Sequence, residues 1–270
     1  MGARSQESSW QEELPTELHS LFFKYDWESV AIGRSGVHVF ALDEGYIKIS
    51  HQGRIFRDEL LAEKERLTWL QGHLPVPEVY FYEQTPNYEY LFLSTIAGTI
   101  ACEPIFAEKL PRLIQILAEA LHMVHSLPIT NCPFQQDISA RLLAIKRLIA
   151  SGRLDTEQFL ARHQDLSPQD WYAQLEKLRP PTETLVFTHG DFCLPNILID
   201  PQKMEISGLI DWGHAGIADY HQDLVDTCWS LGHNFSPDWI PTLQATYGQQ
   251  LIDPKKLSFY RELDDLRSYL

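Results

Sequence analysis

Three short apolar segments, each next to a polar residue that can bind a metal or accept a proton, constrain this chain most strongly. The first, 185–187, leads into a turn that ends at Asp191; the second, 197–199, directly follows Asn196; the third, 208–210, ends at Asp211. Short apolar runs bounded by Gly, Pro or Asp are typical of buried strands, so these three side chains are expected at strand ends or on connecting loops. Two carboxylates and an amide gathered in this way suit phosphoryl transfer, which needs a carboxylate at the attacking hydroxyl and hard oxygen ligands for Mg²⁺.

The alternative is that the same residues only cap ordinary turns at strand ends. Against it stands the arrangement itself, in which an Asp, an Asn five positions later and a second Asp occur in this order around predicted strands. This combination favours a catalytic site, although each motif is weak when taken singly.

The composition limits the partners of the chain. It has 270 residues, 44% hydrophobic and 22% charged, which suits one large or two small globular domains. Its net charge of −15 disfavours binding to nucleic acid or anionic membranes and would suit a cationic substrate, although acidic proteins are common for reasons of solubility alone. The acidic N-terminal segment is no signal peptide, and the longest apolar stretch, 90–102, is too short to span a bilayer. The scattered cysteines lack zinc-site spacing and indicate reduced thiols in a cytoplasmic protein; they are Cys102, Cys132, Cys193 and Cys228.

Periodicity predicts a hairpin over 29–41 and a strand over 45–49 in the first part of the chain, with later strands over 75–82 and 88–93. On the strand over 45–49, Tyr46 and Lys48 share a face, and a lysine in so apolar a strand needs a partner or an outward position. Helices are predicted at 15–23, 57–71, 105–126, 138–150, 171–178, 223–231 and 254–266. Residues 151–168 are expected to be irregular, and Asp219 is expected to cap the helix over 223–231. His122 and His125, three apart on one helix, have no third ligand nearby and are interpreted as structural.

The pattern H-x-D-x-x-x-x-N followed by D-x-G resembles the catalytic and metal-binding loops of kinases, with Gly190 in place of Arg and Trp212 in place of Phe. The HGD form, with the strings NCPF, THGDFCLPN, GIADYHQDL and FYRELDDL, resembles the aminoglycoside 3'-phosphotransferases (kanamycin kinases) over nearly the whole chain. The resemblance implies an α+β, two-lobed protein-kinase-like fold. It places a small β-rich nucleotide-binding lobe at 1–97 and a larger, mainly helical catalytic and substrate-binding lobe at 98–270.

The resemblance also implies roles for individual residues. Asp191 would be the catalytic carboxylate, and Asn196 and Asp211 would bind Mg²⁺. The ATP-binding residues would be Lys48, its partner Glu63, Tyr46, Ser35 in the turn of the hairpin, and Ser94 and Ile96 at the hinge. The plainer interpretation of Lys48 is a strand lysine that faces outward, and that of Glu63 is a residue on a solvated helix face. Glu59 and Glu65, on nearby faces of the same helix, are alternatives to Glu63 as the partner of the lysine.

A cationic aminosugar would be held by acidic residues, for which the resemblance implies Asp155, Glu157, Asp264 and Asp265. Two departures from the family pattern leave these contacts open. The sequence Leu-Ala-Arg at 160–162 stands where close members carry an acidic cluster, and Trp-Ser at 229–230 stands where members often carry Arg-Asp. A charge cluster near a C-terminus is also commonly just solvated.

The function implied is an ATP-dependent O-phosphotransferase acting on a hydroxyl, by resemblance the 3'-hydroxyl, of aminoglycosides such as kanamycin and neomycin, and so conferring resistance. The protein would be cytoplasmic, a monomer or weak dimer, with no nucleic-acid or membrane partner. One alternative is a kinase for another small hydroxylated metabolite, of the choline- or homoserine-kinase type, which share the HGD signature. A nucleotide-binding scaffold without turnover is disfavoured, because Asp191, Asn196 and Asp211 are all present.

Overall fold

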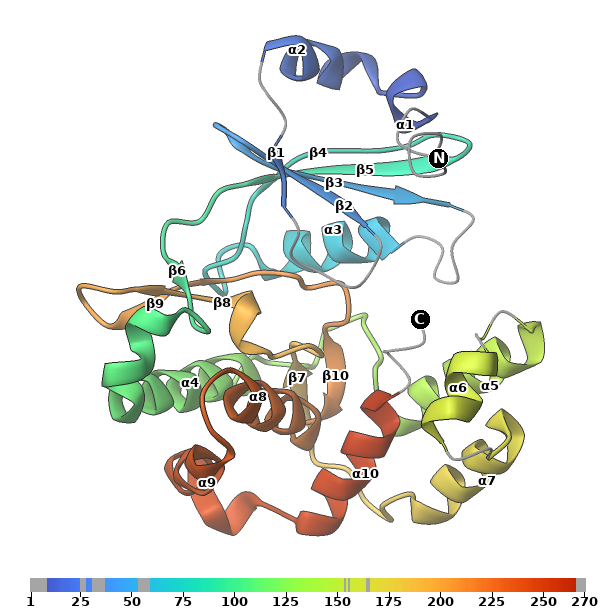
Figure 1. Ribbon diagram of the computed structural model, residues 1–270, viewed down its shortest axis with the longest axis vertical. Helices are drawn as coiled ribbons and strands as arrows, with labels where there is room; N and C mark the ends of the chain where they lie inside the picture. The colour runs from blue at the N-terminus through green and yellow to red at the C-terminus, as the bar shows by residue number, and fades with distance from the viewer. Residues whose placement is uncertain are drawn as a thin grey trace. The chain divides into compact units, whose positions relative to one another are not determined.

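A computed structural model describes residues 9–24, 28–30, 37–52, 59–152, 154, 156–163 and 166–265 (Figure 1). The chain divides into two compact units. One consists of Met1–Gly72 and Val76–Ile96, and the other of His73–Pro75 and Ala97–Leu270. Every helix in the described ranges is too short or too polar to span a lipid bilayer.

The first unit is built on an antiparallel sheet, which in its described part has five strands in the order β1-β2-β3-β5-β4. The strands are β1 (Glu28–Ser29), β2 (His38–Leu42), β3 (Gly45–His51), β4 (Val79–Gln84) and β5 (Tyr88–Ser94). The two sides of the predicted hairpin over 29–41 do pair antiparallel, and its turn lies outside the described residues.

Strand β3 shows why this sheet positions a lysine. Ile47 and Ile49 are fully buried in an apolar core with Trp10 of α1 (Ser9–Glu12) and Leu18 of α2 (Thr16–Lys24). Because side chains alternate along a strand, Lys48 lies on the other face. That face is covered by α3 (Glu59–Leu70), which lies across the sheet from α1 and α2 (Figure 1).

The second unit is mainly helical but carries two small antiparallel sheets in its described part. In one, β8 (Ile197–Asp200) lies between β6 (Thr99–Ile100) and β9 (Glu205–Leu209); in the other, β7 (Leu185–Thr188) pairs with β10 (Gly216–Asp219). The α-helices are α4 (Leu110–His125), α5 (Ile138–Ser151), α6 (Thr156–Arg162), α7 (Pro168–Leu178), α8 (His221–Asn234), α9 (Ile240–Gly248) and α10 (Pro254–Asp265). Short 3₁₀ turns are η1 (Pro104–Lys109), η2 (Leu194–Asn196), η3 (Pro237–Trp239) and η4 (Gln249–Leu251). Helix α4 packs against α9, and α8 packs against α10.

Two sequence expectations for this unit are corrected. The helix predicted over 105–126 is a 3₁₀ turn followed by α4, because Pro111 cannot donate a backbone hydrogen bond and occupies the first turn of the α-helix. The segment 151–168, expected to be irregular, contains helix α6. Phe159 of α6 is fully buried against Trp171 of α7, and so few apolar residues in a polar stretch gave no periodic signal.

A buried ion pair attaches the C-terminal helix to the sheet. Asp219 of β10 is fully buried, and its carboxylate accepts hydrogen bonds from Lys256 Nζ of α10 at 2.6 Å and from His221 Nδ1 at 2.6 Å. It also accepts the backbone N–H of His221, the first residue of α8, at 3.0 Å. The helix begins at His221 and not at residue 223 as predicted, and its N-cap residue is Tyr220 rather than Asp219. Burial alone would raise the pKa of Asp219, but the hydrogen bonds from His221 and Lys256 outweigh it and lower this pKa to about 2.

We predict that Lys256→Met destabilises the protein by about 3–5 kcal/mol, because it leaves the Asp219 carboxylate buried without its cation. Denaturant unfolding at neutral pH measures this difference. A loss below about 1 kcal/mol, the range of an exposed pair, would contradict the assignment.

Asp219→Asn tests how the charge of Asp219 contributes to the free energy of unfolding as the pH changes. The folded-state pKa of Asp219, about 2, lies below its unfolded value of ~3.9. Its charge therefore contributes stability in full above the unfolded value, and this contribution is lost as the pH falls towards the folded value. The gap in unfolding free energy between the wild type and Asp219→Asn should accordingly narrow as the pH falls through that window.

Candidate active site

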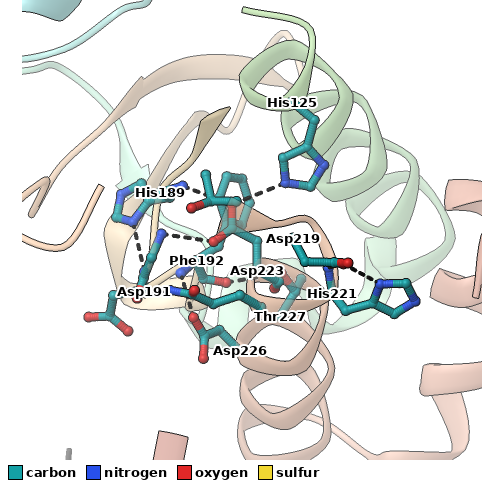
Figure 2. Close-up of polar contacts among 12 residues, drawn as sticks. His125, His189, Asp191, Phe192, Asp219, His221, Asp223, Asp226 and Thr227 are labelled. Atoms are coloured by element: carbon teal, nitrogen blue, oxygen red, sulfur yellow. Dashed lines mark hydrogen bonds and ion pairs between the residues drawn. The ribbon is translucent and has the colours of Figure 1, made fainter. Parts of the chain in front are cut away.

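The turn after β7 and the 3₁₀ turn before β8 bring Asp191 and Asn196 together. The side-chain amide Nδ2 of Asn196 donates to Asp191 Oδ2 at 3.1 Å and to the Asp191 carbonyl at 3.0 Å. With its nitrogen so engaged, the amide of Asn196 has its oxygen Oδ1 left to act as an acceptor or ligand. Asn196 is buried, whereas Asp191 is half-buried and its side chain extends away from α8 (Figure 2).

Asp211 follows β9 and is tied to the same loop through its neighbour. The backbone of Ile210 donates to the Asn196 carbonyl at 3.0 Å and accepts from His189 Nε2 at 2.9 Å. Asp211 itself has φ 63°, in the left-handed region that only short polar residues and glycine adopt readily. Such strain persists where surrounding contacts enforce it, and the buried Trp212, whose indole N–H donates to the Leu209 carbonyl at 2.9 Å, holds the next residue.

His189 joins the two loops as a neutral ring. Its Nε2 must carry the proton, because it contacts the Ile210 carbonyl; Nδ1 therefore accepts from the backbone N–H of Asp191 at 3.2 Å. Burial lowers the pKa of His189, against the opposing effect of nearby carboxylates such as Asp223. With both ring nitrogens occupied, His189 supports the loop and has no nitrogen left for proton transfer.

Gly190 is required by its surroundings. Its φ is +81°, and a Cβ built on it would lie 2.2 Å from the carbonyl oxygen of His214. Any side chain would collide with the backbone there, which accounts for glycine where protein kinases carry arginine.

Asp223 of α8 anchors the turn at His189 and Gly190 and was not identified from the sequence. Its carboxylate accepts the backbone N–H groups of His189 and Gly190, both at 2.8 Å, and His125 Nε2 at 3.1 Å (Figure 2). Burial of this fully enclosed carboxylate would raise its pKa, but the contact with His125 and the backbone donors outweigh burial and lower the pKa of Asp223. His125 in turn contacts the Tyr247 hydroxyl of α9 at 2.9 Å, and His122 contacts the Tyr247 carbonyl at 3.0 Å, which agrees with the structural role expected for both histidines.

In the first unit, Lys48 of β3 meets Glu63 of α3. The ammonium group contacts both carboxylate oxygens, at 2.8 and 2.9 Å, and the two side chains are 13% and 5% exposed. Glu65 is exposed, so Glu63 is the member of this helix that faces the lysine. Tyr46 lies on the same strand face and is 38% exposed, which leaves its ring accessible for stacking.

Of the remaining candidates for nucleotide binding, Ser94 and Ile96 are described by the structure and Ser35 is not. Ser94 ends β5, and its N–H and hydroxyl are both bonded to the backbone of Glu78, at 2.9 Å each. That N–H is therefore not available to an adenine ring. Ile96 is half-buried and is the last residue of the first unit, while Ser35 lies outside the described residues.

The acidic candidates for substrate binding are only partly described. Glu157 is exposed in the first turn of α6, and Asp155 lies outside the described residues. Asp264 of α10 is engaged within the protein, because Arg141 Nη2 of α5 lies 3.4 Å from its Oδ1. Asp265 ends α10, and only its backbone is described.

The donor set at Asn196 and Asp211 fits Mg²⁺. Carboxylate and amide oxygens are the ligands this cation prefers, and the free Oδ1 of Asn196 supplies one of them. Among the described residues no group of three or more His, Cys, Asp or Glu side chains is arranged to hold a metal. A site with few protein ligands is the usual form for Mg²⁺ that is shared with substrate phosphates and water.

The chain is similar to known phosphotransferases over most of its length. Residues 27–260 match the model of the phosphotransferase enzyme family. An aminoglycoside 3'-phosphotransferase of Niallia circulans is 32% identical over 93% of this chain and 96% of its own length. The crystal structure of an aminoglycoside 3'-phosphotransferase of type VIII superposes with TM-score 0.78 and 29% identity, over 94% of this chain and 97% of the other. An aminoglycoside phosphotransferase of Streptomyces rimosus, solved with ADP and streptomycin, gives TM-score 0.74 and 25% identity, over 93% and 99%.

We predict that Gly190→Ala destabilises the protein by more than the ~1–3 kcal/mol that a strained left-handed backbone alone costs. The added methyl group also meets the His214 carbonyl. Denaturant unfolding measures the loss. Gly152→Ala is the matched control: Gly152 has φ +67° but nothing within 4 Å of its Cβ position, so it reports backbone strain without the collision. Equal losses in the two variants would contradict the steric role of His214.

Proposed function

Because the chain belongs to the phosphotransferase enzyme family, we propose that it transfers the γ-phosphoryl group of ATP to a hydroxyl of aminoglycosides such as kanamycin and neomycin, at the 3' position, and thereby confers resistance to them. The observation that carries the proposal is the loop from Asp191 to Asn196, in which an accessible carboxylate is hydrogen-bonded to a buried amide. The relatives named above favour an aminoglycoside over the choline- or homoserine-type alternative.

Asp191 is the proposed catalytic carboxylate. It orients the acceptor hydroxyl and accepts its proton as the bond to phosphorus forms. Because the transition state is loose, most of the rate gain comes from alignment and from neutralising charge rather than from a strong base. The hydrogen bond from Asn196 supports this role, since it restricts the rotamers of a half-buried carboxylate.

Asn196 and Asp211 are the proposed Mg²⁺ ligands, through Oδ1 and the carboxylate. Bound there, Mg²⁺ would neutralise phosphate charge during transfer. The strained backbone of Asp211, at φ 63°, fits a side chain whose direction is fixed for ligation.

Lys48 is the proposed ligand of the α- and β-phosphates of ATP, and Glu63 holds its ammonium group in position. Tyr46, exposed on the same face, is proposed to stack on the adenine ring. Ser35, Ser94 and Ile96 remain proposed nucleotide contacts; for Ser94 only the carbonyl remains as a contact to the base edge, because its N–H is already bonded to Glu78. These residues make up the nucleotide-binding role proposed for residues 1–97, and the rest of the chain carries catalysis and substrate binding.

Acidic side chains are proposed to hold the ammonium groups of the aminosugar, with Asp155, Glu157, Asp264 and Asp265 as candidates. Arg141 modifies this proposal, because an ammonium group that reaches Asp264 must displace or share its guanidinium contact. A partly buried carboxylate with a built-in cation would disfavour neutral sugars, which cannot offer a charge in exchange.

We predict that the purified protein transfers phosphate from labelled ATP to 4,5- and 4,6-disubstituted aminoglycosides, and that NMR of the product locates the phosphate at the 3' oxygen. Acceptors lacking a 3'-hydroxyl should be inert, and the KM for kanamycin should rise with salt, because screening weakens ammonium–carboxylate attraction. Choline and homoserine are the control acceptors. Turnover of either one in preference to every aminoglycoside would overturn the proposal.

We predict that Asp191→Ala lowers kcat for kanamycin by at least about 100-fold, the lower end for loss of a positioned acid–base group, while the protein stays folded. Steady-state assays measure kcat, and circular dichroism checks the fold. Asp200→Asn is the matched control. Asp200 ends β8 four residues after Asn196, and its carboxylate accepts the Gln202 and Lys203 N–H groups and pairs with the exposed Lys203 ammonium group at 3.5 Å. Retention of most activity by Asp191→Ala would remove this residue from the mechanism.

A further inference from the structure

One stripe of helix α8 lies along the backbone of the catalytic loop. Beyond Asp223, which holds His189 and Gly190, the helix offers two more acceptors to the loop, Asp226 and Ser230. Positions three and seven residues beyond Asp223 share one side of a helix and extend about 10 Å along it, at 1.5 Å per residue. The helix thus presents a row of acceptors beside residues 189–194.

Asp226 contacts the first residue after the catalytic carboxylate. Its Oδ2 accepts the backbone N–H of Phe192 at 3.3 Å, and the side chain is only 5% exposed (Figure 2). The neighbouring Thr227 contacts the same residue on its next peptide group, because its hydroxyl lies 3.0 Å from the Phe192 carbonyl and 2.7 Å from the Asp223 carbonyl. Both backbone groups of Phe192 therefore end on α8.

Ser230 contacts the loop one helical turn further on. Its Oγ accepts the backbone N–H of Leu194 at 2.9 Å, and Ser230 is fully buried. Asn234 donates to Ser230 Oγ at 3.2 Å and to its carbonyl at 2.8 Å, so the hydroxyl is itself held in place.

The two residues held in this way lie between Asp191 and Asn196. Cys193, between Phe192 and Leu194, links the backbones of Asp191 and Asn196. Its N–H donates to the Asp191 carbonyl at 2.8 Å, and its carbonyl accepts from the Asn196 N–H at 3.0 Å. Burial raises the pKa of the Cys193 thiol, and the negative charges of Asp191 and Asp226 raise it further, which agrees with Asp226 lying close behind the catalytic carboxylate. A shift of Phe192 or Leu194 would therefore change the separation of Asp191 and Asn196.

We propose that Asp226 and Ser230 are positioning residues for phosphoryl transfer, which fix the Phe192 and Leu194 peptides through hydrogen bonds and so set the geometry of Asp191 against Asn196. The proposal rests on the proposed function for its rate measurement. Neither residue touches the reacting atoms, and both act through the loop backbone.

The test compares three α8 variants in one assay. Asp226→Leu should lower kcat by about 100-fold, the loss expected when a catalytic group shifts by about 1 Å, with little change in KM for ATP or kanamycin. Asp226→Asn should recover most of kcat, because its amide oxygen can still accept the Phe192 N–H. Ser230→Ala should lower kcat in the same sense. Cys228→Ala, which alters a buried side chain of the same helix that makes no hydrogen bond to the loop in the described structure, should leave kcat unchanged.

Backbone amide hydrogen exchange, read by NMR at Phe192 and Leu194, gives a second measurement that needs no turnover. Exchange should accelerate at Phe192 in Asp226→Leu and at Leu194 in Ser230→Ala, and should not change in Cys228→Ala. Unchanged exchange at these amides would overturn the proposal. A kcat for Asp226→Asn as low as that of Asp226→Leu would also overturn it, because the loss of activity would then come from the lost charge and not from the lost hydrogen bond. A wild type that phosphorylates no aminoglycoside would refute the proposed function, while the exchange data would still decide whether α8 holds the loop.

Discussion

The geometry of the loop that leads from His189 to Asp191 depends on one buried carboxylate, that of Asp223. The turn at His189 and Gly190 leaves strand β7 and so loses its ladder partners, yet its amides are buried and need acceptors. A fully enclosed carboxylate is costly without compensation, and here two backbone donors and His125 provide it. Because these donors lower its pKa, Asp223 stays ionised and keeps accepting both amides. Formation of the catalytic turn is therefore coupled to the packing of α8 against α4.

The residues that would perform chemistry and the residues that hold them lie on different elements. Asp191, Asn196 and Asp211 stand on turns next to short strands, whereas Asp223, Asp226, Thr227 and Ser230 stand on a single helix. The helix binds backbone N–H and carbonyl groups of the loop.

The sequence predicted the parts of the site whose signals are local. Short apolar runs ending at polar residues located Asp191, Asn196 and Asp211. The resemblance to the aminoglycoside 3'-phosphotransferases pointed to Lys48 and Glu63, which the structure joins at 2.8 Å. It did not predict the support from α8, because a buried carboxylate on a helix gives the same sequence pattern as an exposed one until its partners are known. Those partners lie 33 and 34 residues earlier for Asp223, and the contact of Asp264 with Arg141 spans 123 residues. Helix α6 was missed for a related reason. Its fully buried aromatic residue, Phe159, packs against Trp171 of the next helix, and no periodic stripe of apolar residues accompanies it in the sequence.

The substitution of glycine for the arginine of protein kinases has a steric explanation with a functional consequence. In protein kinases that arginine responds to a phosphorylated activation loop, which requires space for a long cationic side chain. Here the segment after Asp211 turns back at once, with the Ala215 N–H bonded to the Trp212 carbonyl at 3.1 Å, and brings the His214 carbonyl to where a Cβ of residue 190 would be. The backbone of the segment after Asp211 therefore occupies the space that a side chain at position 190 would need. The turn at His189 and Gly190 is consequently held to the segment before Asp211 through the Ile210 carbonyl, and to α8 through Asp223.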